Sequence, residues 1–335
     1  MEYQEALERA RTAGELVWHY ATLDTLGIIL QTNCLLATEV SFQNDIRETS
    51  TADIAFSAAL QAMTEGAKYG AFAREAIKYL QDEELWQPNF SPVSGPLTRN
   101  ARFILCASED PDSLYAWRTY SQGGISCAIG LDPKTALGVV DPGPNPSQRR
   151  VHHWRPVIYA PAEIQLEAER VLAQLGDRWL LERGEGLSAS DANAALLVII
   201  TDLAETRSRV RAVAKDQSFE DEHEQRVTVD RVSFNALMTT PSNMGPRPQV
   251  RLVSSTHAQW SEPFEKADLA PKLPIRAIRL GPDAPDSATT ATQWLLLANG
   301  YEIDPTPDGH NGSSVSTNWA DAVILDRSRH PYRTR

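Results

Sequence analysis

Short strand-like segments recur along the whole chain, and this pattern restricts the possible folds more than any other feature. They are rich in β-branched and aromatic residues, which favour strands, and segments with helical spacing separate them. The clearest are LVWHYAT (16–22), RFILCAS (102–108), GGISCAIGLD (123–132) and LPIRAIRLGP (273–282). We therefore expect an α+β fold, in which helices flank a mixed or antiparallel central sheet of short strands.

Helical patterns occupy several stretches between these strands. One covers residues 2–13, and an alanine-rich one runs from Ala52 to about Leu85. The longest spans about 161–216, where a cap-like SASD separates two periodic segments, and we interpret it as a helical layer or insertion. A chain of 335 residues is long enough for one large domain or two ordinary ones, and we expect a single domain over 1–335.

The charge of the chain limits its partners. The formal net charge is −12, and a surface of that sign repels both DNA and anionic membranes. We therefore expect no membrane partner, and nucleic acid only as a substrate. The one dense basic segment, RSRHPYRTR at 327–335, is interpreted as a solvated tail.

Cysteine usage and the apolar runs indicate the compartment. Cys34, Cys106 and Cys127 form no CxxC pair and lie beside apolar residues, which is typical of buried thiols in a reducing compartment. The longest aliphatic run, 196–200, is too short to cross a membrane, and the N-terminal residues are charged rather than apolar. These features predict a cytoplasmic protein.

The acidic segment FEDEHEQRVTV holds the best catalytic candidates. Read as a strand, it places Glu222, Glu224 and Arg226 on one face, because strand side chains alternate with period two. Like charges at this spacing repel, although a charged run is commonly just a solvated surface. Arg226 could pair with one carboxylate and leave the other to act as a base or to stabilise a cation.

Two further groups contain side chains suited to ligand binding. His19 lies inside the first expected strand, where a ring nitrogen can hold a hydrogen bond at a fixed place, although a lone strand histidine is often structural. Trp117 and Tyr120 precede a glycine turn that allows backbone to approach a ligand. A tyrosine face is a natural stacking surface, and the alternative is core packing at a helix end.

A third group, Asn44, Asp45 and Glu48, follows the second expected strand. Asn-Asp is ordinary turn chemistry, and Glu48 can complete a helix-start capping arrangement. Alternatively the two carboxylates line a pocket, where they orient a ribose or hold a metal. The chain has no phosphate-binding loop, dinucleotide-binding glycine motif, nucleophile elbow or zinc-protease motif.

The pattern as a whole resembles a bacterial family, the domain of unknown function 2971 family. Seven short pieces match in the family's order and cover nearly the whole chain. Two departures are Ala21, where a hydroxyl residue is usual, and Gln225, where an aromatic is frequent. The matching pieces are WHYATLDTLGIIL, FQNDIRE, AWRTYSQGGISCAIGLD, VIYA, FEDEHEQRVTV, LPIRAIRLGP and SRHPYR.

A looser similarity connects the chain with ADP-ribosyltransferase folds of the His-Tyr-Glu type. That resemblance implies an ADP-ribosyltransferase-like fold, in which His19 positions the nicotinamide ribose and Tyr120 stacks on nicotinamide. Glu222 or Glu224 would support the ribosyl cation, and we favour Glu224 as the deeper of the two. The residues expected to bind NAD, the co-substrate, are His19, Tyr20, Trp117, Tyr120, Arg226, Asn44, Asp45 and Glu48.

Three functions are compatible with these residues. The first is an NAD-consuming transferase or glycohydrolase acting on a macromolecular acceptor, as a toxin or phage-defence effector, with no metal required. The second is a metal-dependent nuclease or phosphohydrolase that uses Asp45, Glu48, Glu222 and Glu224 as oxygen ligands. The third is a non-enzymatic sensing or interaction module, in which the same residues form a structural polar network.

Overall fold

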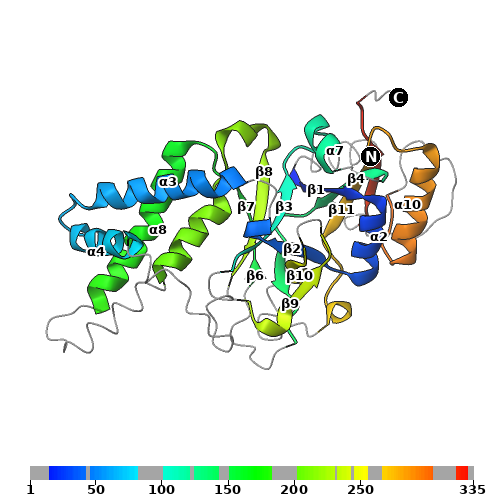
Figure 1. The fold of residues 1–335 in the computed structure, drawn as a ribbon. Helices are drawn as coiled ribbons and strands as arrows, with labels where there is room; N and C mark the ends of the chain where they lie inside the picture. The colour runs from blue at the N-terminus through cyan, green and yellow to red at the C-terminus, as the bar shows by residue number, and fades with distance from the viewer. Residues whose placement is uncertain are drawn as a thin grey trace, which may run out of the picture.

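A large, mostly antiparallel β-sheet flanked by helices forms the centre of the molecule in the computed structural model (Figure 1). The expected combination of a central sheet with flanking helices is confirmed. The structure describes residues 15–42, 46–81, 101–120, 124–142, 151–182, 202–230, 232–242, 245–255, 266–304 and 322–330, with the backbone alone for 46–49.

Nine strands form the main path of the sheet. Their order is β12 (Ile324–Arg327), β11 (Ile275–Leu280), β4 (Ser126–Leu131), β1 (Val17–Thr22), β3 (Phe103–Ser108), β2 (Leu35–Glu39), β10 (Arg247–Ser255), β5 (Ala136–Val139) and β6 (Val151–His152). Off this path, β8 (Glu224–Val229) pairs with β3 and with β7 (Trp154–Pro156), and β9 (Leu237–Thr240) pairs with β10. Strands β11 and β12 pair in parallel, and the remaining pairs between these strands are antiparallel.

Strand β3 is the point where the sheet divides. One edge of β3 pairs with β8 along all of its residues. The other edge pairs with two different strands: Ser108 lies opposite Trp18 of β1, whereas Ile104 lies opposite Thr38 of β2. Between these two contacts β1 and β2 diverge, so the backbone of residues 105–107 faces a gap instead of a continuous neighbouring strand.

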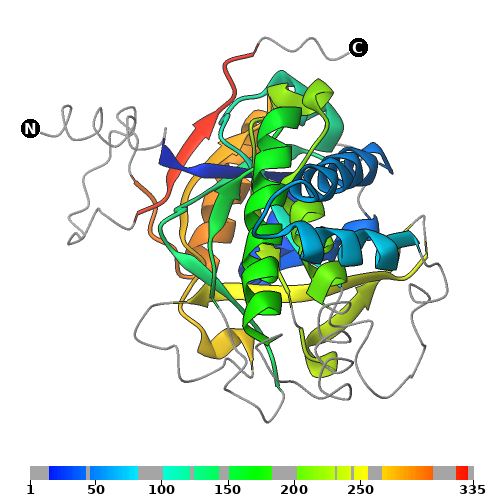
Figure 2. The same cartoon turned by 90° about the vertical axis from the view of Figure 1, so that its left-hand side faces the viewer.

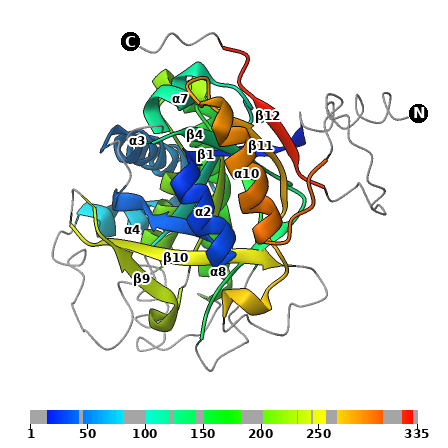
Figure 3. The same cartoon turned by 90° about the vertical axis from the view of Figure 1, so that its right-hand side faces the viewer.

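Helices cover both faces of the β1 side of the sheet. Helices α2 (Leu23–Thr32) and α10 (Asp286–Ala298) pack together on one face, where Leu26, Ile29 and Leu296 enter the main core (Figure 3). Thr22 caps the start of α2 by accepting a hydrogen bond from the Thr25 amide. Helix α7 (Leu114–Tyr120) packs on the opposite face.

A second apolar cluster, separate from the sheet core, holds the helical layer together (Figures 1 and 2). It contains α3 (Ile46–Met63), α4 (Gly70–Gln81), α8 (Pro161–Glu182) and a helical segment at 202–213. Helices over 161–182 and 202–213 agree with the expected layer. The layer is nevertheless larger than expected, because the apolar faces of α3 and α4 pack against α8.

Short helical turns and the C-terminal segment complete the described chain. The 3-10 turns are η2 (Val40–Phe42), η4 (Gln217–Glu222), η5 (Phe234–Ala236) and η7 (Ala267–Leu269). The start of the basic tail is not simply solvated, since the Arg329 amide donates to an Asp112 carboxylate oxygen, and His330 Nε2 bonds the Asp112 carbonyl at 2.7 Å. Within the described ranges, no helix combines the length and apolar character that a membrane crossing requires.

Candidate functional site

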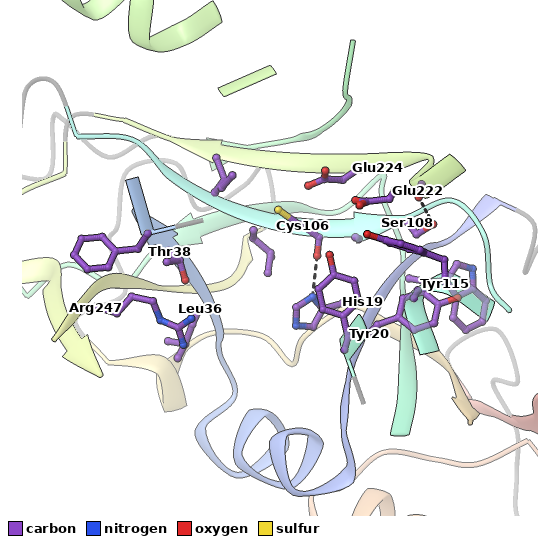
Figure 4. Close-up of a pocket in the computed structure, with 17 residues that line it drawn as sticks. His19, Tyr20, Leu36, Thr38, Cys106, Ser108, Tyr115, Glu222, Glu224 and Arg247 are labelled. Carbon is purple, nitrogen blue, oxygen red and sulfur yellow. Dashed lines mark hydrogen bonds between the residues drawn. The ribbon is translucent and has the colours of Figure 1, made fainter. Parts of the chain in front are cut away.

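A cavity of about 280 Å³ lies at the division of the sheet, where β1 and β2 part along β3. Five of the candidate residues line it together, although they come from distant parts of the sequence (Figure 4). They are His19 and Tyr20 of β1, Tyr120 of α7, Glu222 of η4 and Glu224 of β8. The cavity volume lies just below the usual range for ligand pockets, about 300–1,000 Å³.

Glu224 is the deepest charged group of the cavity wall, and its side chain is only 6% exposed. Arg226, two residues later on the same face of β8, donates two hydrogen bonds to Glu224. Its Nε lies 2.8 Å from Oε1 and its Nη2 lies 3.0 Å from Oε2. The Arg226 guanidinium also donates to the Ala212 carbonyl in the helical segment, which ties this face to the helical layer. The pairing of Arg226 with one carboxylate therefore occurs as expected.

Lys215 supplies the second cation, and the sequence did not single it out. Its ammonium lies between the two glutamates, 2.6 Å from Oε2 of Glu222 and 2.8 Å from Oε2 of Glu224. Repulsion between the two carboxylates was a signal that a cation was needed, but Arg226 was the obvious choice. Lys215 follows a helical segment, and only the folded chain brings it to the start of β8.

The two glutamates are held in different ways. Glu222 does not lie on the strand, because η4 ends there and His223 takes a left-handed conformation with φ 44° before β8 begins. This corrects the expectation that Glu222 lies on the face of the strand. Lys215 contacts only Oε2 of Glu222, whereas both oxygens of Glu224 accept bonds from cations. Among the residues that the structure describes, no cation contacts the other oxygen of Glu222.

The electrostatics of the cluster keep Glu224 ionised. Burial alone would raise the pKa of Glu224, but Arg226 and Lys215 outweigh burial and lower it to about 2. Glu222 and Glu224 line the cavity, whereas Lys215 and Arg226 do not. The formal charges of the four side chains cancel, yet the cavity faces the carboxylates while the cations stand behind them. A ligand at this end meets a negative surface.

His19 lies in the gap between β1 and β2, and one of its nitrogens is already used. Nδ1 is 2.8 Å from the Cys106 carbonyl oxygen, which has no strand partner on that side. Burial lowers the pKa of His19 more than this bond raises it, so the ring is neutral at pH 7. Since a carbonyl only accepts, Nδ1 carries the proton and Nε2 is the acceptor. The ring can therefore receive a hydrogen bond from a ligand hydroxyl.

Tyr20 and Trp117 have structural contacts. The Tyr20 hydroxyl donates to the Asp110 carbonyl at 2.7 Å and accepts from the Ser113 amide at 2.8 Å, which fixes the loop before α7. Trp117 packs edge-on against Tyr20 at 4.7 Å between ring centroids. The Trp117 side chain belongs to the core and does not line the cavity, so core packing, the alternative to a stacking surface, describes it.

Aromatic surface at the cavity comes instead from Tyr120 and Tyr115. Their residues are 44% and 45% exposed, and both line the cavity. Burial and the Glu222 carboxylate raise the pKa of both hydroxyls, which stay protonated. A third tyrosine, Tyr159, accepts the Glu224 amide proton at 2.8 Å and fixes the start of β8.

The remaining candidates do not join this set. Asn44 and Asp45 lie outside the described residues, as does the side chain of Glu48 in α3. Arg226 contacts Glu224 and is not part of the cavity wall. Among described side chains, no three histidine, cysteine, aspartate or glutamate residues gather as metal ligands. Between Glu222 and Glu224, the ammonium of Lys215 stands where a bridging cation would bind.

Comparison with known proteins gives no further constraint, since no family model, no curated protein and no solved structure matches this chain.

Proposed function

We propose that this chain cleaves the bond between nicotinamide and ribose in NAD and passes the ADP-ribosyl group to water or to a macromolecular acceptor. The observation that supports this proposal is the meeting of His19, Tyr120 and the two glutamates in one cavity. These residues come from β1, α7, η4 and β8, so their convergence is a property of the fold and not of any local sequence.

The chemistry of the bond suits the carboxylate end of the cavity. When the carbon–nitrogen bond breaks, its electron pair goes to nicotinamide, which leaves neutral, and positive charge develops on the ribosyl carbon. Fixed carboxylates stabilise that charge because they need no reorganisation when it forms. Oxygen of water or of an acceptor then bonds to the same carbon, and its proton passes to the solvent. With a pKa of about 2, Glu224 is a permanent anion and a poor general base near pH 7.

The contacts divide the work between the two glutamates. Glu224 has both oxygens engaged by Arg226 and Lys215, and it positions Lys215. Lys215 in turn positions Glu222, whose other oxygen is free of cations. Glu222 is therefore the carboxylate that contacts the ribosyl carbon, and Glu224 is a positioning residue. This reverses the preference for Glu224, since the deeper carboxylate, which Arg226 fixes, is also the more fully paired one.

His19 and Tyr120 orient the substrate. The acceptor nitrogen Nε2 of His19 receives a ribose hydroxyl, because Nδ1 is committed to the Cys106 carbonyl. The Tyr120 ring provides a face for nicotinamide, and its high hydroxyl pKa excludes a role as a base at neutral pH. Stacking requires a ring and not a hydroxyl.

Variants of these two residues test the proposed roles through nicotinamide release from NAD. Tyr120→Phe should keep most of the wild-type rate, whereas Tyr120→Ala should lower kcat/KM at least about tenfold, a loss of ~1.4 kcal/mol. His19→Phe, which keeps the ring volume but loses Nε2, should also lower kcat/KM. Equal activity in all three variants would contradict the assigned roles.

The competing hypothesis is that the Glu224 cluster is only a structural polar network, and contacts of the cluster support it as well. Arg226 and Lys215 connect Glu224 with the helical layer through the Ala212 carbonyl and residues 214–215, so the cluster contributes to packing. Glu222→Gln distinguishes the two hypotheses. Glu222 has fewer contacts than Glu224, so this change should disturb the fold less. A variant that folds normally and releases no nicotinamide supports catalysis, while one that releases nicotinamide at the wild-type rate supports a purely structural cluster.

A further inference from the structure

Arg247 gives the cavity a second charged end, opposite in sign to the glutamates. It opens β10 and lines the cavity beside Leu36 and Thr38 of β2 (Figure 4). In the same figure Glu222 and Glu224 lie away from Arg247, on the side of β8, with Cys106 near Glu224. The wall of the cavity is therefore divided into an anionic end and a cationic end.

The charge on Arg247 is not neutralised by the described part of the chain. Its Nε is buried and has no hydrogen-bond partner, and no ion pair to its guanidinium is present. A buried donor left without a partner costs free energy, so a position of this kind is expected where a ligand completes the bonding. Elsewhere in the cavity the charges of Glu222 and Glu224 are balanced by Lys215 and Arg226. Counting described residues alone, Arg247 leaves the cavity with one uncompensated positive charge, in a chain whose formal net charge is −12.

The Thr38 hydroxyl is a second hydrogen-bond donor beside Arg247. The Thr240 hydroxyl donates to Oε1 of Gln249 at 2.7 Å, and Nε2 of Gln249 donates to the Thr38 hydroxyl oxygen at 2.9 Å. Gln249 is only 4% exposed, which fixes this chain of bonds. Because the Thr38 oxygen already accepts a bond, its own proton is left to donate. The Arg247 guanidinium can only donate, and Thr38 beside it keeps a proton to donate, which suits an anion with several acceptor oxygens.

We infer that the Arg247 end of the cavity binds a phosphate group, and that the cavity holds the nicotinamide mononucleotide half of the substrate. This inference rests in part on the proposed function. That half is zwitterionic, with a positive nicotinamide ring and a negative phosphate, and the two ends of the cavity match its two charges. A cavity of about 280 Å³ suits one nucleotide and not two, so the adenosine half extends through the opening.

The experiment compares ligands that carry one feature each. ADP-ribose has the diphosphate but no bond to break, and nicotinamide riboside has the cationic ring but no phosphate. Arg247→Gln should weaken ADP-ribose binding about ten- to a hundredfold, because a charge-assisted pair is lost, and should leave the affinity for nicotinamide riboside unchanged. Thr38→Val should weaken ADP-ribose binding by about threefold to tenfold. Isothermal titration at two salt concentrations measures both ligands.

Arg251→Gln is the matched control, since Arg251 is a half-buried arginine of the same strand that does not line the cavity. It should bind ADP-ribose as the wild type does. Arg247→Gln should melt at or above the wild-type temperature, because Arg247 makes no bond that the variant loses. A second variant, Arg247→Lys, keeps the charge and should retain part of the affinity.

Each outcome bears on the inference separately from the proposed function. Arg247-dependent binding of ADP-ribose without any cleavage of NAD would uphold the phosphate site and refute the proposed function. Cleavage of NAD with the same KM in Arg247→Gln would do the reverse. The phosphate site is also overturned if the wild type binds no ADP-ribose, or if Arg247→Gln weakens both ligands equally, since Arg247 would then act only on the shape of the cavity.

Discussion

Asp53 and Glu224 are each held by two cations, and of these two carboxylates only Glu224 faces the cavity. Asp53 in the helical layer accepts bonds from Arg207 and Arg211, with Arg211 at 2.8 Å from Oδ1 and 2.6 Å from Oδ2. Glu224 is held equally closely by Arg226 and Lys215. The side chain of Asp53 is 23% exposed, against 6% for Glu224. Cationic pairing lowers the pKa of both, against the opposing effect of burial.

Pairing of a carboxylate with two cations is therefore not enough to identify a functional site. The Asp53 cluster joins a helix to a neighbouring helical segment and lines no part of the cavity. The Glu224 cluster is more fully buried and turns its carboxylates to the cavity while its cations stand behind. If this difference is what matters, changes in the Asp53 cluster should affect stability slightly and activity not at all, whereas changes near Glu224 should affect both.

The largest stability effect is expected from Lys215→Met. Removing the ammonium leaves Glu222 without a cation and Glu224 with one, and breaking a buried pair in this way costs about 3–5 kcal/mol of unfolding free energy. Urea unfolding monitored by circular dichroism measures it. The matched control is Lys68→Met, because the side chains of the Lys68–Asp177 pair are 62% and 50% exposed, and solvent screens such a pair, so its loss should change the unfolding free energy far less. Similar costs for the two variants would remove the distinction between the clusters.

The pH dependence of stability should identify Glu224 next. Its folded pKa of about 2 lies below the unfolded value of 4.5, so it stabilises the fold fully above pH 4.5 and loses this effect as the pH falls towards 2. The shift corresponds to about 3 kcal/mol. Urea unfolding of the wild type and of Glu224→Gln should therefore converge between about pH 5 and pH 2. Parallel curves over that range would show that the ionised Glu224 is not stabilised by its partners.

Asp53→Asn should give the smallest effect. Its partners Arg207 and Arg211 are about one-third exposed, and solvent screens such pairs, so the loss should be about 1 kcal/mol or less of unfolding free energy. Nicotinamide release should not change. A loss of activity in this variant, with the fold intact, would mean that the helical layer affects the cavity in a way that its contacts do not indicate.

Much of the fold could be predicted from the sequence because it depends on local patterns. The β-branched and aromatic character of residues 16–22 and 102–108 predicted strands where β1 and β3 lie. The alanine-rich periodicity after Ala52 predicted helices where α3 and α4 lie. Periodicity shows that a face is buried but not against what, and so the packing of α3 and α4 onto α8 was missed. The division of the sheet was also beyond prediction, because it depends on two registers of β3.

The candidate site shows the same limit. Residue types with distinctive chemistry, such as His19 in a strand and the paired glutamates, could be picked out one by one. Lys215, Arg247 and Thr38 could not, because their importance depends on neighbours that the chain brings together from distant positions. Trp117 is the opposite case, because its residue type suggested a ligand-binding role that its position does not support. An aromatic beside a glycine turn gave no indication that its ring would pack on Tyr20.

Cleavage of NAD at this cavity can be tested by incubating the purified chain with NAD and measuring free nicotinamide by chromatography. The assay compares the wild type with Glu222→Gln and Asp53→Asn. We expect release by the wild type and by Asp53→Asn at equal rates, and a loss of at least about a hundredfold in Glu222→Gln, a change of ~2.7 kcal/mol in the barrier. Absence of release by the folded wild type, with cell extract added as a source of acceptor, would contradict this expectation, as would full activity in Glu222→Gln.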